Sequence, residues 1–410
     1  MPTRIDADLL IPGVGEPVND GAVVFESGTI TYAGAAAGAT SAATTKVATL
    51  MPGLWDCHGH FTGMAIGNLE HDATEPIARK AARAVGDIGR TLMGGVTSIR
   101  EVGGLGIELR HVVDEGSIAG PSIYPAGRIL STTGGHADVH SLPIDWVDGS
   151  PGRLGLNCDG VADCLKAVRL QLRQGASVIK VCASGGVMSE IDHPIHQQFS
   201  DEELEAIVDE AARADRAVAA HCHGKPGIMA ALRAGARTIE HGSYLDDEAA
   251  ATMVEADAIL VPTRYILAEL LDRQGDIPAY AYRKALMVAE HHEMALKTAI
   301  AAGVRIAMGT DIFMSGEGHG TNGREIRLLV EAGMTPLEAI EAATANGPLT
   351  LGPQAPASGR LVEGYDADLI ALDFDPLDDP AQWGDPDRVT HVWKAGEAVK
   401  SPEHTTRDRP

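Results

Sequence analysis

Short β-branched runs alternate with Ala-rich amphipathic stretches through the middle of the chain, and this alternation restricts the possible folds most strongly. The pattern is typical of parallel strands joined by helices. We expect strands over residues 49–60, 96–101, 122–129, 177–183, 217–223, 238–242, 259–262 and 305–311. Eight parallel strands that alternate with helices can close into a TIM-like (β/α)8 barrel. The sequence therefore predicts an α/β fold with such a barrel at its centre.

Both ends of the chain differ from this middle part. Residues 1–50 and 357–410 carry Gly/Asp turns between short β segments. We expect these ends to pair into one small β-sandwich domain, with residues 51–356 forming the barrel. The length of 410 residues suits one barrel with a small appended domain.

The composition excludes two classes of partner. The formal charge of −24 would repel the phosphates of a nucleic acid. No run approaches the roughly 18 consecutive apolar residues of a membrane span. The first residues lack the charged and apolar regions of an export signal, and the five cysteines have no disulfide spacing. We therefore expect a cytoplasmic protein with free thiols.

Two histidines stand two residues apart in the first expected barrel strand, within Asp56-Cys57-His58-Gly59-His60. Side chains alternate faces along a strand, so His58 and His60 point the same way and can bind one metal ion. Such a pair alone is weak evidence for a metal site, since two histidines on one strand also occur by chance.

Other side chains that can bind metal stand on further expected strands. Lys180 lies within the strand 177–183, and His221, His241 and Asp311 stand at or near the ends of three more. The carboxyl ends of barrel strands converge on one rim, where active sites are built. We therefore expect these side chains to meet the histidine pair there.

Each of these residues also has a simpler explanation when it is taken alone. A histidine at a strand end often anchors a loop, and Asp311 could cap a helix. Lys180 could be a salt-bridged lysine or one that extends to solvent. Their shared place on the rim is what favours a joint role.

The motifs together resemble the amidohydrolase superfamily, and within it the metal-dependent prolidase-like and Xaa-Arg/Lys carboxypeptidase-like group. They are Asp56-x-His58-x-His60, Ile179-Lys180, His221-Cys222-His223, Glu240-His241-Gly242, Gly309-Thr310-Asp311 and Gly364-Tyr365-Asp366-Ala367-Asp368-Leu369. The resemblance covers nearly the whole chain. The set is highly specific for the superfamily and only moderately specific for the group.

The resemblance implies a centre of two divalent metal ions, with zinc as the expected metal. One ion would be bound by His58, His60 and Asp311. The other would be bound by His221 and His241. Lys180 would bridge both ions as its carbamate, which forms from CO2 or bicarbonate, and burial near two cations favours the uncharged amine that reacts.

Hydrolysis of a carbon–nitrogen bond, most simply an amide, is the hypothesis that follows from this centre. A water that bridges two divalent ions becomes a hydroxide near neutral pH. Asp311 would take its proton as general base and deliver it to the departing nitrogen as general acid. We expect no covalent intermediate, because no serine or cysteine nucleophile is needed.

Substrate-binding side chains are expected around the metal ions. His136, after the third strand, and His223 match substrate-binding positions of the group, although either histidine could instead anchor a loop. Weaker candidates, which fall on expected rim loops, are His140, Tyr244, Arg264 and Tyr265. Residues 185–200 resemble a mobile loop of the group, but Glu190 stands where a proline is common.

A dipeptidase or carboxypeptidase-like enzyme that acts on a small peptide or N-acyl amino acid is the favoured interpretation. A second one keeps the same metal centre for a non-peptide amide, carbamate, urea or lactam, as in relatives that degrade mycotoxins and herbicides. Two others are a single-metal ring-opening hydrolase of the imidazolonepropionase type, which needs no bridging Lys180, and a non-catalytic scaffold. We expect a small-molecule substrate and, as in relatives, a homo-oligomer.

Overall fold

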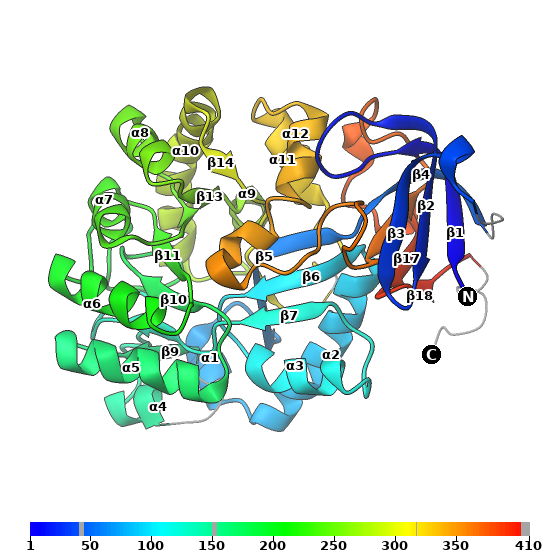
Figure 1. The fold of residues 1–410 in the computed structure, drawn as a ribbon. Helices are drawn as coiled ribbons and strands as arrows, with labels where there is room; N and C mark the ends of the chain where they lie inside the picture. The colour runs from blue at the N-terminus through cyan, green and yellow to red at the C-terminus, as the bar shows by residue number, and fades with distance from the viewer. Residues whose placement is uncertain (41–44, 150–153, 317, 403–410) are drawn as a thin grey trace.

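Strands and helices alternate along most of the chain in the computed structural model, which describes residues 1–40, 45–149, 154–316 and 318–402 (Figure 1). The strands are β1 Thr3–Leu10, β2 Val18–Glu26, β3 Thr29–Ala35, β4 Thr45–Pro52, β5 Leu54–Met64, β6 Val96–Glu101, β7 Ser122–Pro125, β8 Ile129–Ser131, β9 Gly155–Asn157, β10 Ile179–Cys182, β11 Val218–Cys222, β12 Thr238–His241, β13 Ile259–Val261, β14 Arg305–Ile306, β15 Ile312–Met314, β16 Leu369–Leu372, β17 Val389–Lys394 and β18 Glu397–Lys400. The α-helices are α1 Leu69–Thr74, α2 Ile77–Met93, α3 Gly106–Asp114, α4 Ile144–Gly149, α5 Val161–Gln174, α6 Asp201–Ala212, α7 Lys225–Ala234, α8 Asp247–Glu255, α9 Arg264–Asp272, α10 Ala279–Ala302, α11 Arg324–Glu331 and α12 Pro336–Ala342. The predicted α/β fold is confirmed.

Two parallel sheets carry the strands of the middle part. Among the described residues, one sheet has seven strands in the order β14-β13-β12-β11-β10-β8-β9, and the other has four in the order β15-β5-β6-β7. Backbone hydrogen bonds join segments next to these sheets. Ser177 N donates to Pro125 O at 2.7 Å, and Cys57 N donates to Met308 O at 2.8 Å. Parallel pairing makes the carboxyl ends of neighbouring strands point the same way.

The single strand expected over residues 49–60 is wrong, because the chain forms two strands there. β4 ends at Pro52 and β5 begins at Leu54, and the two belong to different sheets. Gly53 lies at the break, where an added Cβ would stand 2.1 Å from the hydroxyl of Thr97. Only glycine allows so close an approach, so the break is fixed by packing.

Two other expected strands are also divided. The segment 122–129 separates into β7 and β8, and Gly127 between them has a φ of 75°, which glycine adopts without strain. The segment 305–311 contains only β14, and the chain resumes extended pairing at β15. Asp311 therefore stands just before a strand rather than at the end of one.

Strands from both ends of the chain form a third sheet. Among the described residues its order is β18-β17-β16-β4-β1-β2-β3, drawn in blue and red in Figure 1. β4 pairs in parallel with β1 and antiparallel with β16, so segments more than 300 residues apart hold each other in place. The strands are arranged as one sheet, and the expected sandwich is not confirmed. Ile5, Leu50 and Leu369 share its buried core.

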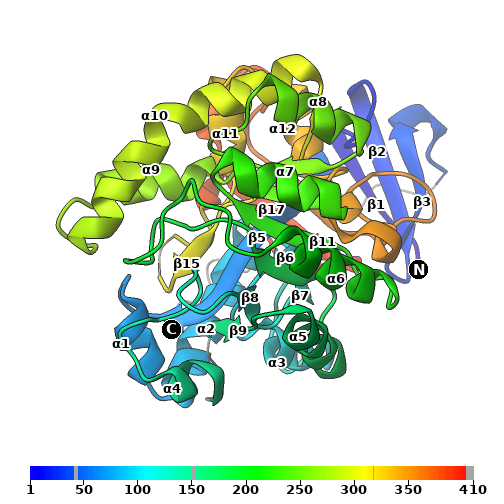
Figure 2. The same cartoon turned by 90° about the vertical axis from the view of Figure 1, so that its left-hand side faces the viewer.

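The helices cover the parallel sheets with apolar faces. In α2, the buried residues Ala84, Ile88 and Leu92 recur every four positions and so form one stripe. α9 and α10 lie side by side (Figure 2) and pack on each other. All five cysteines are buried with free thiols. No helix in the described part of the chain combines the length and apolar character that a membrane crossing requires.

The terminal sheet should depend on its shared core. We expect Leu50→Ala to lower the free energy of unfolding by about 2–5 kcal/mol, because it leaves a cavity at a fully buried site. Urea unfolding followed by circular dichroism measures the change. The control Leu170→Ala, on the exposed face of α5, should stay within about 0.5 kcal/mol of the parent. Equal effects from both variants would contradict the packing described here.

Candidate active site

The six predicted metal ligands lie close together on or next to the parallel strands and line one cavity. They are His58 and His60 on β5, Lys180 on β10, His221 on β11, His241 on β12 and Asp311 just before β15. The five from the strands are buried, and the side chain of Asp311 is 20% exposed. The strand alternation expected for the β5 histidines holds, with Cys57 packed in an apolar cluster.

His58, His60 and Asp311 form one group of possible metal ligands. Asp311 Oδ1 lies 3.0 Å from His60 Nε2 and 3.6 Å from His58 Nε2. Burial by itself raises the pKa of Asp311, but the imidazoles of His58 and His60 outweigh it and lower that pKa. Asp311 is therefore held ionised, as a metal ligand or a general base must be.

A second group contains His221 and His241 together with His223. His221 Nδ1 and His241 Nε2 lie 2.9 Å apart, and the ring of His223 stacks on that of His241 at a centroid distance of 4.8 Å. Burial is the main cause that lowers the pKa of all three imidazoles, and to about 3 for His223. Neutral imidazoles are the form that binds metal ions.

Lys180 lies beside the first group. Its Nζ is 3.3 Å from His58 Nε2, and the residue is only 2% exposed. It does not reach solvent, and the described residues give it no ion pair, so neither simpler explanation applies. Burial is the main cause that lowers its pKa, which favours the neutral amine.

Two of these residues have a backbone conformation that is unusual for side chains other than glycine. His241 has a φ of 69° and Asp311 a φ of 58°. Each such residue costs of order 1–3 kcal/mol, and strain of this kind clusters at functional sites. The strain occurs at the last residue of β12 and at the residue just before β15, and these two side chains lie with the other possible ligands.

Hydrogen bonds fix the orientation of three of the rings through their Nδ1 atoms. The partners are Glu240 Oε2 for His58 at 2.7 Å, Gly103 O for His60 at 2.7 Å and Thr263 Oγ1 for His241 at 2.6 Å. With Nδ1 engaged, each Nε2 is the atom left to face the centre. Partners of this kind orient metal-binding histidines and adjust their basicity.

Glu240 is itself held by a buried arginine. Arg100 Nη2 donates to Glu240 Oε1 at 2.7 Å, and both side chains are fully buried. Burial alone would raise the pKa of Glu240, but Arg100 and then His58 lower it far below its usual range. The sequence reasoning missed Arg100, although a charged residue inside the expected barrel strand 96–101 was a usable signal.

Asp56 is the first residue of the Asp-x-His-x-His motif. It joins the segment that carries His58 to the segment that carries Asp311. It accepts hydrogen bonds from Thr310 Oγ1 at 2.6 Å, Asn322 Nδ2 at 2.7 Å and His58 N at 3.0 Å. It therefore ties the backbone of His58 to the residue that precedes Asp311. This explains why the motif begins with a carboxylate that does not point at the centre.

A cavity opens above these groups, and the empty space in it, together with the adjoining open solvent, amounts to about 1030 Å³. Besides the six residues, His136 and His223 line it, as the sequence analysis predicts for substrate-binding side chains. Apolar side chains form most of the remaining wall; they include Leu69 of α1, Ile266 and Leu270 of α9, Val288 of α10 and Phe313 of β15.

Four predicted substrate-binding residues are not among the described residues that line this cavity. The Tyr265 hydroxyl is 2.9 Å from Thr321 Oγ1, and Arg264 Nη2 is 3.6 Å from Glu293. The Tyr244 hydroxyl donates to Met287 O at 3.3 Å, and His140 Nε2 lies 3.6 Å from Glu190. Their positions next to strand ends suggested the rim, but their side chains point to other partners, so the structure does not support that role.

His292 lines the cavity and was missed. Ser243 Oγ links it to the centre, at 3.0 Å from His292 Nδ1 and 2.8 Å from His223 Nδ1. The residues predicted for the site stand at or near expected strands, whereas His292 belongs to α10. Its spacing from Val288 and Ala295 places a polar residue on the buried face of that helix, which was an available signal.

The family of the chain follows from a sequence match over most of its length. The model of the amidohydrolase family matches residues 49–399. The chain belongs to the amidohydrolase family. Enzymes of this family are generally metal-dependent, which agrees with the two groups of possible ligands.

Individual relatives of this amidohydrolase include enzymes with known names. Ochratoxinase from Aspergillus niger is 44% identical over 98% of this chain and 87% of its own length. Its crystal structure matches with a TM-score of 0.93 at 43% identity, covering 98% of this chain and 96% of that one. A prolidase complexed with N-methylphosphonate-L-proline matches with a TM-score of 0.89 at 32% identity, over 98% and 100% of the two chains. The protein is accordingly a hydrolase that acts on carbon–nitrogen bonds.

The hydrogen bond from His58 to Glu240 should matter for metal affinity. We expect Glu240→Gln to weaken binding by about 10–100-fold, because the amide removes the negative charge that supports His58 and presents a donor to Arg100. Competition with a chromogenic chelator measures this affinity. Glu210→Gln is the control, since Glu210 pairs with Arg169 and Arg213 and contacts no proposed ligand. Unchanged affinity in Glu240→Gln would show that this contact does not tune the site.

Proposed function

We propose that this amidohydrolase is a binuclear metal enzyme that hydrolyses the amide bond of a small peptide or an N-acyl amino acid. The observation that carries the proposal is the pair of buried ligand groups at the floor of one cavity. Their possible ligand atoms lie within 4.8 Å of one another in each group. Lys180 lies beside the first group and lines the same cavity as the second.

The residues fit two divalent ions. Imidazole nitrogens and carboxylate oxygens suit zinc, with His58, His60 and Asp311 on one ion and His221 and His241 on the other. Lys180 would add CO2 at its neutral Nζ: a nitrogen–carbon bond forms, one proton leaves to solvent, and an anionic carbamate results. That anion would supply both ions with an oxygen ligand and offset part of their charge.

Bound divalent ions supply two kinds of chemistry, activation of a water molecule and polarisation of the substrate carbonyl. Asp311 would take a proton from the attacking water on its carboxylate and pass it to the departing nitrogen. Its lowered pKa keeps it ready to accept that proton. Neutral imidazoles of His136 and His223 on the cavity wall would orient the substrate.

The names of the relatives support an amide substrate, since they include an ochratoxinase and a prolidase. The same centre acting on a non-peptide amide, carbamate, urea or lactam is the second candidate. One observation favours it: Lys180 and Asp311 are the only charged residues, among the described ones, that line the cavity. Both belong to the proposed metal site, so none of the described residues that line the cavity is an arginine that could bind a substrate carboxylate.

The barrel and the small domain that would position this centre are also proposed. We infer that the two parallel sheets are arcs of one (β/α)8 barrel over residues 51–356, which the hydrogen bonds from Cys57 to Met308 and from Ser177 to Pro125 support. Residues 1–50 and 357–410 would form the small domain. Self-association and a cytoplasmic location stay predictions of the sequence.

Substitution of Lys180 distinguishes a binuclear enzyme from a single-metal enzyme. We expect about two zinc ions per chain after reconstitution with zinc and bicarbonate, and fewer in Lys180→Ala, whose kcat/KM should fall by more than about 100-fold. Elemental analysis measures the zinc content, and initial rates give kcat/KM. Lys166→Ala is the control, because Lys166 is exposed on α5. One metal per chain and full activity in Lys180→Ala would exclude the carbamate bridge.

A substrate panel separates the two candidate functions. We expect the zinc-loaded protein to hydrolyse dipeptides or N-acyl amino acids, and a chelator to abolish this turnover until zinc is returned. Dipeptides with and without C-terminal proline, N-acyl amino acids and aryl carbamates would be compared by product release. Turnover confined to the aryl carbamates would replace the first candidate by the second.

A further inference from the structure

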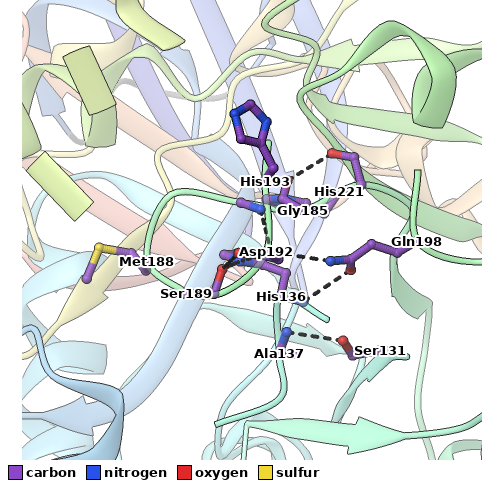
Figure 3. Close-up of polar contacts among 12 residues, drawn as sticks. Ser131, His136, Ala137, Gly185, Met188, Ser189, Asp192, His193, Gln198 and His221 are labelled. Atoms are coloured by element: carbon purple, nitrogen blue, oxygen red, sulfur yellow. Dashed lines mark hydrogen bonds and ion pairs between the residues drawn. The ribbon is translucent and has the colours of Figure 1, made fainter. Parts of the chain in front are cut away.

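We propose that Ser189 and Asp192 are positioning residues that hold the His136 ring so that its Nε2 faces the substrate cavity. Figure 3 shows the three side chains close together, at the point where the loop of residues 185–198 crosses the site. The inference rests on the proposed function only for its kinetic test. It assigns a task to a loop for which the sequence predicts only mobility.

The ring of His136 is confined on several sides. It stacks on the ring of His221 with centroids 4.3 Å apart and an interplanar angle of 19°. Gly186 lies against it so closely that an added Cβ would stand 2.1–2.5 Å from three ring atoms. The backbone N of His136 donates to Gln198 Oε1 at 3.1 Å. These contacts fix the plane of the ring but leave open a 180° flip, which would exchange Nδ1 with Cδ2 and Nε2 with Cε1.

Ser189 decides the flip state of the ring and which of its nitrogens carries a proton. Its Oγ lies 2.7 Å from His136 Nδ1, and its one proton is donated to Asp192 Oδ1. A hydroxyl that has donated its proton to a carboxylate can only accept from another partner. His136 Nδ1 must therefore carry a proton, whether the ring is neutral or charged. Nε2, for which the described residues provide no hydrogen bond, is left for the substrate.

Asp192 is anchored strongly enough to impose this arrangement. Lys284 of α10 reaches it with Nζ 2.9 Å from Oδ1, and both side chains are nearly buried. Gly186 N and Gln198 Nε2 donate to Asp192 Oδ2 at 2.9 and 3.3 Å. The ion pair with Lys284 keeps Asp192 an acceptor, so the direction of the Ser189 hydrogen bond is fixed.

The same anchor sets part of the cavity wall. Lys284 Nζ also donates to the carbonyl oxygens of Gly186 at 3.1 Å and Ser189 at 2.8 Å. Val187 and Met188, which lie between these residues, line the cavity. The loop thus presents a polar atom, Nε2 of His136, next to two apolar side chains. We expect a substrate with a hydrogen-bonding group next to an apolar one to use both.

Nitrogen NMR tests the hydrogen bond without any substrate. Long-range ¹⁵N–¹H spectra of histidine side chains distinguish a ring protonated at Nδ1 from one protonated at Nε2, and His136→Ala identifies the signals. We expect the Nδ1–H pattern in the parent protein and a mixture or the other tautomer in Ser189→Ala. Ser131→Ala is the matched control, because Ser131 Oγ accepts from the neighbouring Ala137 N and not from the ring. It should keep the parent pattern.

A double-mutant cycle tests the consequence for turnover in the zinc-loaded protein. We expect Ser189→Ala to lower kcat/KM by about fivefold to tenfold, mainly through KM, the range for losing one hydrogen bond. In a His136→Ala background the same change should alter kcat/KM by less than about twofold, since its target is gone. Gly186→Ala should displace the ring and resemble His136→Ala, with Ser189 and Asp192 intact.

The outcomes separate the two proposals. An unchanged tautomer in Ser189→Ala, or an equal loss of activity with and without His136, would overturn the positioning role and leave the proposed function intact. A parent protein that hydrolyses nothing in the substrate panel would refute the proposed function. The NMR comparison would still decide the role of Ser189.

Discussion

The buried hydrogen bond between Arg100 and Glu240 is the interaction on which the active site depends. Both side chains are fully buried, so breaking the pair would leave an uncompensated charge at a cost of about 3–5 kcal/mol. Arg100 also donates to Cys57 O at 2.6 Å and to Thr238 Oγ1 at 2.9 Å, and so joins β5, β6 and β12. Glu240 in turn orients His58. One network therefore holds the strands in register and aims a proposed ligand.

Much of the site could be predicted because its residues lie on or next to the parallel strands. The alternation along β5 placed His58 and His60 on one face, and the convergence of parallel strands brought His221, His241 and Lys180 to them. The boundaries were less predictable. Gly53 breaks the first strand because of a contact with Thr97, and that contact depends on tertiary packing that no local pattern records.

Side chains from helices and loops were the part that the sequence could not place. His292 and Lys284 lie on the buried face of α10 and reach the cavity or its loop, whereas Tyr265 and Arg264 begin α9 but turn away. Whether such a residue faces the cavity depends on the orientation in which its helix packs on the sheet. The periodicity of α10 marked its buried face, but it did not indicate what that face would meet.

The central claim is a binuclear centre bridged by a modified Lys180, and anomalous X-ray diffraction at the zinc edge tests it most directly. The measurement requires crystals of the protein reconstituted with zinc and bicarbonate. The account predicts two anomalous peaks, one contacted by His58, His60 and Asp311 and the other by His221 and His241, with carbamate density on Lys180 between them. A single peak, or two peaks with an unmodified Lys180, would contradict it.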